Sequence, residues 1–113
     1  EPEEGYQLTK KAIESGNLPD AFLYASDELA LGGYCAFSES GIQVGKDISI
    51  VSIDNLPYAS YLTPPLTTVA LNMALLGKTA AMALDSQIRG RDYPLTFFTP
   101  VELIKRESCV KKA

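Results

Sequence analysis

Short apolar runs alternate along the chain with longer segments of helical spacing, a pattern typical of α/β folds. Residues 21–25, 48–53 and 66–71 are rich in β-branched, aliphatic and aromatic side chains, and each run is predicted to form a strand. Two further short strands are predicted at residues 95–98 and 101–104, separated by Thr-Pro. A helix between the first two strands forces a crossover. These two strands should therefore be parallel, with their carboxyl ends at one edge of the sheet.

Three helices are predicted, and each has recognisable ends. The first covers residues 2–15 and tolerates a proline in its first turn. The second follows the N-cap Ser26 and ends at Gly41, which suits a left-handed C-terminal cap. The third runs from its cap, Asn72, to Arg89. Together with the strands, these helices indicate one α/β unit with helices packed on a largely parallel sheet.

Two consecutive glycines, Gly32 and Gly33, lie in the middle of the second predicted helix. Each glycine should cost about 1 kcal/mol relative to alanine in a helix interior. We therefore expect another backbone to approach the helix closely at this point.

Three apolar residues, Tyr58, Tyr61 and Leu62, precede a Pro-Pro sequence that stops regular structure. They fit a single helical turn that packs locally, which explains most aromatic residues, and they also fit a face that binds a partner. The sequence leaves both interpretations open.

Composition narrows the range of functions. The 113 residues have a net charge of −4, which argues against a nucleic-acid-binding surface, and they include no histidine. The missing histidine excludes Ser/His/Asp and Cys/His catalysis and the common histidine zinc sites. We expect no catalytic residue, metal or cofactor, and no enzyme activity. A basic cluster formed by Lys105, Arg106, Lys111 and Lys112 is expected to be solvated.

Location and completeness can also be judged from the chain. No apolar run is long enough to span a membrane and no signal segment opens the sequence, so a cytoplasmic protein is expected. The two cysteines, Cys35 and Cys109, are expected to be buried thiols rather than a disulfide framework. The chain starts without methionine and with a helix instead of a strand, so we expect a fragment of a longer protein.

Polar residues follow both strands of the first crossover. Ser26 and Asp27 come after the first strand, and Asp54 and Asn55 come after the second. Ligands of open parallel sheets bind outside the carboxyl ends of the strands, and carboxylates accept strong hydrogen bonds from sugar hydroxyls and cationic groups. The simpler interpretation is turn chemistry for Asp54 and Asn55, and a helix-dipole interaction for Asp27. A phosphate-binding site is not expected, because no Gly-rich loop follows either strand.

Four blocks of sequence carry a resemblance to a known family. They are AFLYASDELALGGYCAFSESGI (21–42), DISIVSIDN (47–55), YLTPPLTTV (61–69) and VELIKRESC (101–109). In order and spacing they resemble the lactose-repressor/galactose-repressor family of bacterial transcription regulators. The resemblance implies the C-terminal part of an effector-binding core, similar to periplasmic sugar-binding proteins. The DNA-reading headpiece of such proteins lies upstream and is absent here.

The resemblance also implies how this chain is divided. Residues 1–69 would belong to the C-terminal lobe, a parallel-sheet, three-layer α/β sandwich that is only partly present. Residues 70–91 would supply a crossing strand and a helix of the N-terminal lobe. Residues 92–113 would return to the C-terminal lobe. The chain would then be the effector-binding and dimerisation part of a cytoplasmic, sugar-responsive repressor.

Site residues can be carried over position by position. The family's ligand-contacting aspartate matches Asp54, with Asn55 beside it, and Ser26 precedes the helix acid Asp27. The segment from Leu71 to Met73 corresponds to one that lines the pocket in some members, and core packing explains these apolar residues equally well. In the family, the second helix and the turn before Pro-Pro contribute to a homodimer, which implicates Leu31, Tyr34, Cys35, Tyr61 and Leu62. The implied partners are therefore a sugar-like effector and a second copy, with operator DNA bound only through the headpiece and no membrane contact.

Two alternatives remain open at this point. A free-standing sugar-binding receptor of the same fold would have no DNA-reading segment upstream. A dimerisation module would bind no ligand in this fragment. The upstream sequence would separate the first alternative from a repressor.

The third predicted helix carries an apolar stripe that must be covered. Its members are Met73, Leu76, Ala80, Leu84 and Ile88. Burying one Leu, Ile or Met fully is worth roughly 1.5 to 3 kcal/mol, so exposure of several is costly in a marginally stable domain. Either the helix folds back onto the sheet of its own chain or it reaches across to a second copy. We expect the second arrangement.

Overall fold

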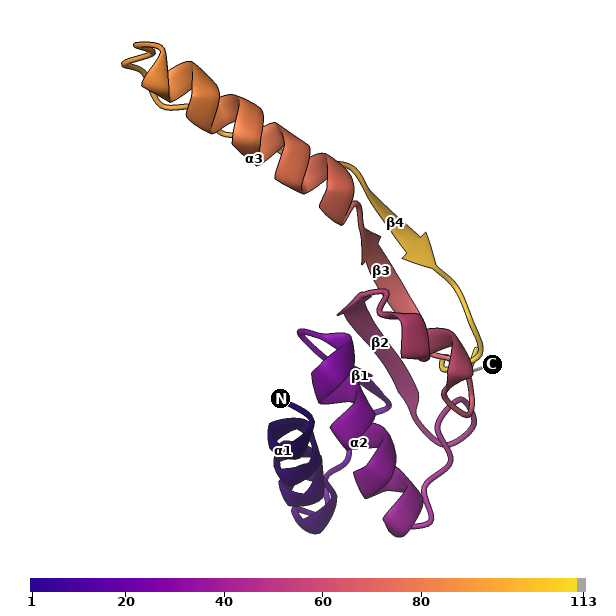
Figure 1. The fold of residues 1–113 in the computed structure, drawn as a ribbon. Helices are drawn as coiled ribbons and strands as arrows, with labels where there is room; N and C mark the ends of the chain where they lie inside the picture. Colours follow the sequence, from indigo (N-terminus) through magenta and orange to yellow (C-terminus); the bar gives the residue numbers. More distant parts are fainter. Residues whose placement is uncertain (112–113) are drawn as a thin grey trace.

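The computed structural model describes residues 1–111 and contains a four-stranded sheet (Figure 1). Its strands are β1 (Ala21–Leu23), β2 (Ser49–Asp54), β3 (Thr67–Leu71) and β4 (Val101–Ile104), and they lie in that order. The first three are parallel, and β4 is antiparallel to β3. The predicted α/β fold and the parallel crossover between the first two strands are confirmed.

Helices α1 (Pro2–Glu14), α2 (Asp27–Glu39) and α3 (Met73–Ile88) and the 3-10 helix η1 (Pro57–Tyr61) complete the structure. The predicted caps are in place. The Ser26 hydroxyl accepts a hydrogen bond from the Leu29 N–H at 3.2 Å. Gly41 has a φ of 70°, which the missing side chain allows, and the next N–H, that of Ile42, bonds back to the carbonyl of Phe37 at 2.9 Å. Helix α2 is therefore fixed at both ends by its own sequence.

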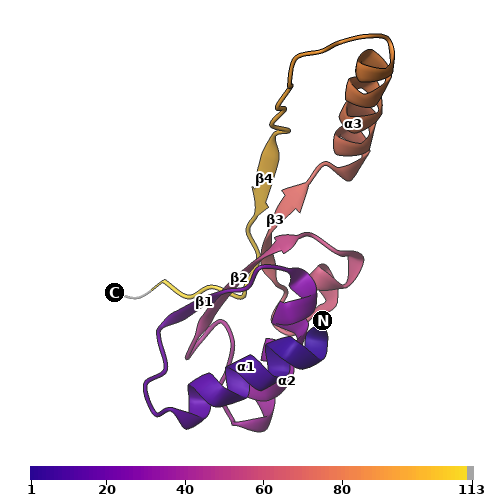
Figure 2. The same cartoon turned by 90° about the vertical axis from the view of Figure 1, so that its left-hand side faces the viewer.

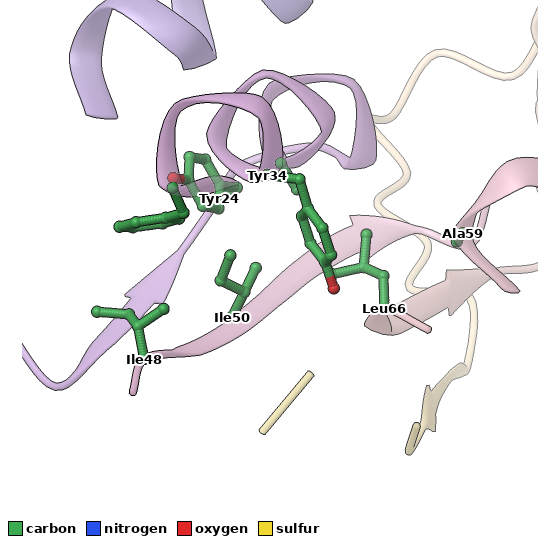
Figure 3. Close-up of a cluster of buried hydrophobic side chains, with 8 residues drawn as sticks. Tyr24, Tyr34, Ile48, Ile50, Ala59 and Leu66 are labelled. Atoms are coloured by element: carbon green, nitrogen blue, oxygen red, sulfur yellow. The ribbon is translucent and has the colours of Figure 1, made fainter. Parts of the chain in front are cut away.

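The hydrophobic core lies between α2 and one face of β1 and β2 (Figure 3). Phe22 of β1 stacks on Tyr24 and meets the ring of Phe37 edge to face. Leu23, which points to the other face of the sheet, is 73% exposed. The described residues thus supply the sheet and one helical layer of the expected sandwich. The buried cluster comprises Tyr24, Ala30, Tyr34, Phe37, Ile48, Ile50, Ala59 and Leu66.

The glycine pair of α2 is explained by contacts inside the chain. A Cβ atom on Gly32 would lie 1.8 Å from the carbonyl oxygen of Pro2, on α1. A Cβ atom on Gly33 would lie 2.2 Å from the hydroxyl of Tyr24. At the same crossing, a Cβ atom on Gly5 would lie 2.0 Å from the carbonyl oxygen of Leu29. The expected close backbone approach is confirmed for Gly32, and α1 provides it.

Helix α3 projects away from the rest of the molecule (Figure 2). Strand β2 ends where Asp54 pairs with Ala70, while β3 and β4 continue as a two-stranded arm to the pair of Leu71 with Val101. The radius of gyration is 17.9 Å, compared with about 13 Å for a compact chain of this size. No residue of α3 is buried.

One predicted strand is wrong. Residues 95–98 form no strand, and the four described strands leave no partner beside them. A strand needs a neighbour to satisfy its backbone, and alternation of apolar residues cannot supply one. The rings of Phe97 and Phe98 are 54% and 94% exposed, so they also lack the burial that favours a strand.

The exposed α3 leads to a prediction for the 113-residue chain in solution. Met73 is 63% exposed and Ile88 is 76% exposed, so the helix does not fold back onto its own sheet. We expect copies of the chain to associate through this stripe, and Leu84→Glu to weaken the association because it places a charge in the covered surface. Sedimentation equilibrium measures both, with Lys78→Glu as the control on an exposed polar position of the same helix. A compact monomer across the micromolar range, with α3 protected from hydrogen exchange, would contradict the prediction.

Candidate functional site

The predicted polar residues meet at the carboxyl ends of β1 and β2. Ser26 caps α2 just beyond β1, and Asp54 is the last residue of β2. Asp54 also pairs with Ala70 of β3, and the exposed Met73 follows three residues later as the first residue of α3. We call this surface the polar edge; its predicted members are Ser26, Asp27, Asp54, Asn55 and Met73.

The backbone at the end of β2 is unusual. Asp54 has a φ of 124° and Asn55 has a φ of 55°, both in the region that side chains other than glycine rarely adopt. Such residues cost on the order of 1–3 kcal/mol each and persist where surrounding contacts fix them. The contacts that hold this turn are therefore part of the site.

Arg106 holds the turn from the side of the returning chain. One terminal guanidinium nitrogen donates to the Asn55 Oδ1 at 2.9 Å, and the other terminal nitrogen donates to the carbonyl of Leu66 at 2.8 Å. The Arg106 N–H also donates to the Thr67 hydroxyl at 2.9 Å. The expectation that the basic cluster is solvated is therefore wrong for Arg106, because its guanidinium group donates hydrogen bonds to oxygen atoms of the folded chain. Lys112, another member of that cluster, lies outside the described residues.

The Asp54 carboxyl is half-buried and has no cationic partner in the described part of the chain. Within residues 1–111, no lysine or arginine forms an ion pair with it. Desolvation raises the pKa of this carboxyl, the negative charges of Asp27 and Glu28 raise it further, and a hydrogen bond from the Asp27 backbone opposes them. The carboxylate is thus available to accept hydrogen bonds from hydroxyl groups or from a cation.

Asp27 occupies a different environment from Asp54. Its side chain is completely buried and has no exposed surface with which to contact a ligand. Oδ1 accepts hydrogen bonds from the hydroxyls of Ser52 and Thr68, the second at 2.6 Å, and Oδ2 accepts the Leu56 N–H at 2.7 Å. Sequence reasoning grouped Asp27 with the ligand-binding residues and missed all three donors.

A buried hydroxyl lies near the same carboxylates. The Tyr58 hydroxyl oxygen is buried and has no hydrogen-bond partner among the described residues. Burial raises the pKa of this phenol, and the charges of Asp27, Glu28 and Asp54 raise it further. The sequence pattern had assigned Tyr58 to an apolar surface, and its neighbours now place it close to the polar edge.

The residues predicted for a dimer interface fall into two groups. Tyr61 is 84% exposed, Cys35 is exposed, and Leu31 and Leu62 are half-buried. Tyr34, in contrast, is 8% exposed and donates its hydroxyl to the Pro64 carbonyl at 2.8 Å, inside the core of its own chain.

Both cysteines differ from the prediction. Cys35 and Cys109 are free and exposed, so the expectation of buried thiols is wrong. Cys35 lies between the buried residues Tyr34 and Ala36 on α2, and the helical turn directs its side chain away from the core that they enter.

Two kinds of feature were not found in the described part of the chain. No group of three histidine, cysteine, aspartate or glutamate residues within 1–111 could hold a metal ion. No helix among these residues is both long and apolar enough to cross a membrane.

Comparison with known proteins places the chain in a family. Residues 1–109 match the periplasmic binding protein-like domain. The HTH-type transcriptional repressor MelR of Bacillus subtilis (strain 168) is 42% identical over 106 residues, which are 94% of this chain and 31% of that protein. The lactose operon repressor of Escherichia coli (strain K12) is 38% identical over 104 residues, covering 92% of this chain and 29% of that repressor.

Solved structures agree with the sequence matches. The crystal structure of the lac repressor dimer bound to operator and the anti-inducer ONPF has a TM-score of 0.89 at 37% identity, covering 96% of this chain and 38% of that one. A LacI family regulator from Enterococcus faecium with bound ribose has a TM-score of 0.81 at 32% identity, covering 96% of this chain and 40% of that one.

The fold and the matches together define a periplasmic-binding-protein-like lobe. The chain belongs to the lactose-repressor/galactose-repressor family and represents part of its effector-binding domain. The family resemblance seen in the sequence is confirmed. The chain spans about a third of the length of the relatives named above, 31% of one and 29% of the other. These relatives are repressors rather than enzymes.

Proposed function

We propose that this chain forms one wall of the effector-binding site of a sugar-responsive bacterial repressor, with Asp54 as the principal anchor for the ligand. The observation that carries the proposal is a half-buried carboxylate at the carboxyl end of a parallel strand, without a cationic partner among the described residues. Ser26, Asn55 and Met73 would line the same wall. The ribose bound by the Enterococcus faecium relative supports a sugar-like ligand.

The division of the chain is part of this proposal. Residues 1–69 would form the C-terminal lobe, residues 70–91 would cross to the N-terminal lobe, and residues 92–113 would return. The arm of β3 and β4 and the exposed α3 support the crossing. The hydrogen bond from the Ile50 N–H to the Ser108 carbonyl, at 2.8 Å, supports the return because it brings the last segment alongside β2.

Regulation would follow from the position of the ligand between two lobes. An effector that binds one arrangement of the lobes more tightly shifts the population toward it, and the coupling to DNA affinity is reciprocal. DNA would be bound by an upstream headpiece in a cytoplasmic homodimer. Leu31, Cys35, Tyr61 and Leu62 are the exposed or half-buried residues available for the dimer contact. Tyr34 would support the contact from beneath.

The proposal predicts that operator affinity depends on a sugar. For the full-length protein, fluorescence anisotropy with operator DNA should show a change of at least about 5-fold in affinity on addition of the effector, the lower end of typical allosteric coupling. A panel of monosaccharides and galactosides provides the candidates, and the 113-residue chain, which is acidic, serves as the control without DNA binding. Sequence-selective DNA binding by this chain alone, or an operator affinity that no sugar alters, would contradict the proposal.

A further inference from the structure

The buried Asp27 carboxylate connects four elements of the fold. It lies at the start of α2 and accepts hydrogen bonds from the hydroxyls of Ser52 on β2 and Thr68 on β3. It also accepts a hydrogen bond from the Leu56 N–H, just before η1. It is completely buried, and no described lysine or arginine pairs with it. A buried charge is costly unless it is well hydrogen-bonded, and here three donors meet that need.

These donors surround the turn that carries Asp54. Leu56 is two residues beyond Asp54, and its N–H is fixed at 2.7 Å from the Asp27 Oδ2. The Thr68 hydroxyl donates to the Asp27 Oδ1 and accepts the Asn55 N–H at 3.3 Å. The Asp27 carboxylate therefore fixes the residue that follows the two with positive φ, and it reaches Asn55 through Thr68.

We propose that Asp27 is a positioning residue of the effector site, which holds the Asp54–Asn55 turn in its ligand-binding shape without contacting the ligand itself. This inference rests on the proposed function of Asp54, and it changes the role first assigned to Asp27. A direct ligand contact would need exposed carboxylate surface, which Asp27 lacks.

Two substitutions separate positioning from a direct charge contact. Asp27→Ala removes the acceptor for Leu56 and should weaken effector binding by about 10-fold or more, because the turn is no longer fixed. Asp27→Asn keeps one acceptor oxygen for the Leu56 N–H, and its amide group can donate to the Ser52 and Thr68 hydroxyls, which are able to accept. Binding by Asp27→Asn should therefore stay within about 3-fold of the unmodified protein.

A double-mutant cycle with Asp54→Asn measures the coupling between the two residues, which a general destabilisation of the fold would not produce. With the Asp54 charge removed, Asp27→Ala should weaken effector binding by a clearly smaller factor than in the unmodified protein, because the main charged group that it positions is gone. Additive losses, or an Asp27→Asn loss as large as that of Asp54→Asn, would overturn the inference in favour of direct contact. Unchanged binding by Asp54→Asn would instead reject the proposed function.

Amide hydrogen exchange tests positioning without any ligand. In the full-length protein, Asp27→Ala should accelerate exchange at Leu56 at least about 10-fold more than at Ile50, whose N–H bonds to Ser108 in the core. Equal acceleration at both amides would show general destabilisation and overturn the inference. If Asp27→Ala fails to fold, Thr68→Val removes one arm of the same network and carries the test, with the same expected preference for the turn amides over Ile50.

Discussion

Replacing Gly32 with alanine should destabilise the folded lobe by about 2–3 kcal/mol, a typical cost of overpacking. The new Cβ atom would lie 1.8 Å from the Pro2 carbonyl oxygen and 2.5 Å from the Tyr6 N atom, so two helix backbones would have to separate. That loss is a large part of the 5–15 kcal/mol that typically separates folded and unfolded states. Urea denaturation followed by circular dichroism measures the change.

The matched control is Gly77→Ala in α3. A Cβ atom there meets nothing within 4 Å, so the substitution should be neutral or should stabilise the helix by up to about 1 kcal/mol. Equal unfolding midpoints for the two variants would show that the crossing of α1 and α2 is not close-packed in solution. A lower midpoint for Gly32→Ala alone would support the contact.

Local chemistry determined how much of this fold could be predicted. The caps at Ser26 and Gly41 depend on neighbours within five residues, so the ends of α2 could be read from the sequence. The parallel pairing of β1 and β2 followed from the helix between them. The glycine pair indicated a close backbone approach for the same local reason, although its partner, α1, could not be named.

The role of Asp27 depended on residues far away in the sequence. Ser52 is 25 residues from Asp27 and Thr68 is 41 residues away. An acid in the first turn of a helix is favourable whether it is exposed or buried, so its position alone carries no information on burial. Arg106 was missed for a similar reason, because its partner Asn55 is 51 residues away.

The family resemblance assigned Asp54 where composition and spacing left two interpretations open. An acid after a strand fits ordinary turn chemistry as well as ligand binding. The structure adds that Asp54 is half-buried and lacks a cationic partner among the described residues, two properties that no local pattern reports. Its positive φ of 124° also guides the choice of substitution, because asparagine tolerates this backbone region better than alanine.

Asp54→Asn should weaken effector binding by about 2 kcal/mol or more, which is roughly 30-fold, because it removes a charge-assisted hydrogen bond. The raised pKa of the Asp54 carboxyl gives this bond a characteristic pH dependence. The effector affinity of the unmodified protein should be highest above that pKa, where Asp54 is ionised. On acidification the affinity should fall at a higher pH than it would for an ordinary aspartate. The asparagine variant has no such group to protonate, so its weaker binding should not show this loss of affinity on acidification. Titrations at several pH values measure both effects.

Isothermal titration calorimetry of the full-length protein with its sugar effector provides the most direct test of the Asp54 site. The titration is performed for the unmodified protein, for Asp54→Asn and for Asp47→Asn. Asp47 lies two residues before β2 begins and is exposed, so the control makes the same chemical change near the opposite end of this strand, away from the polar edge. We predict one binding site per chain, a loss of about 30-fold for Asp54→Asn and no loss for Asp47→Asn. Equal affinity for the unmodified protein and Asp54→Asn would contradict the assignment of the effector site to this edge of the sheet.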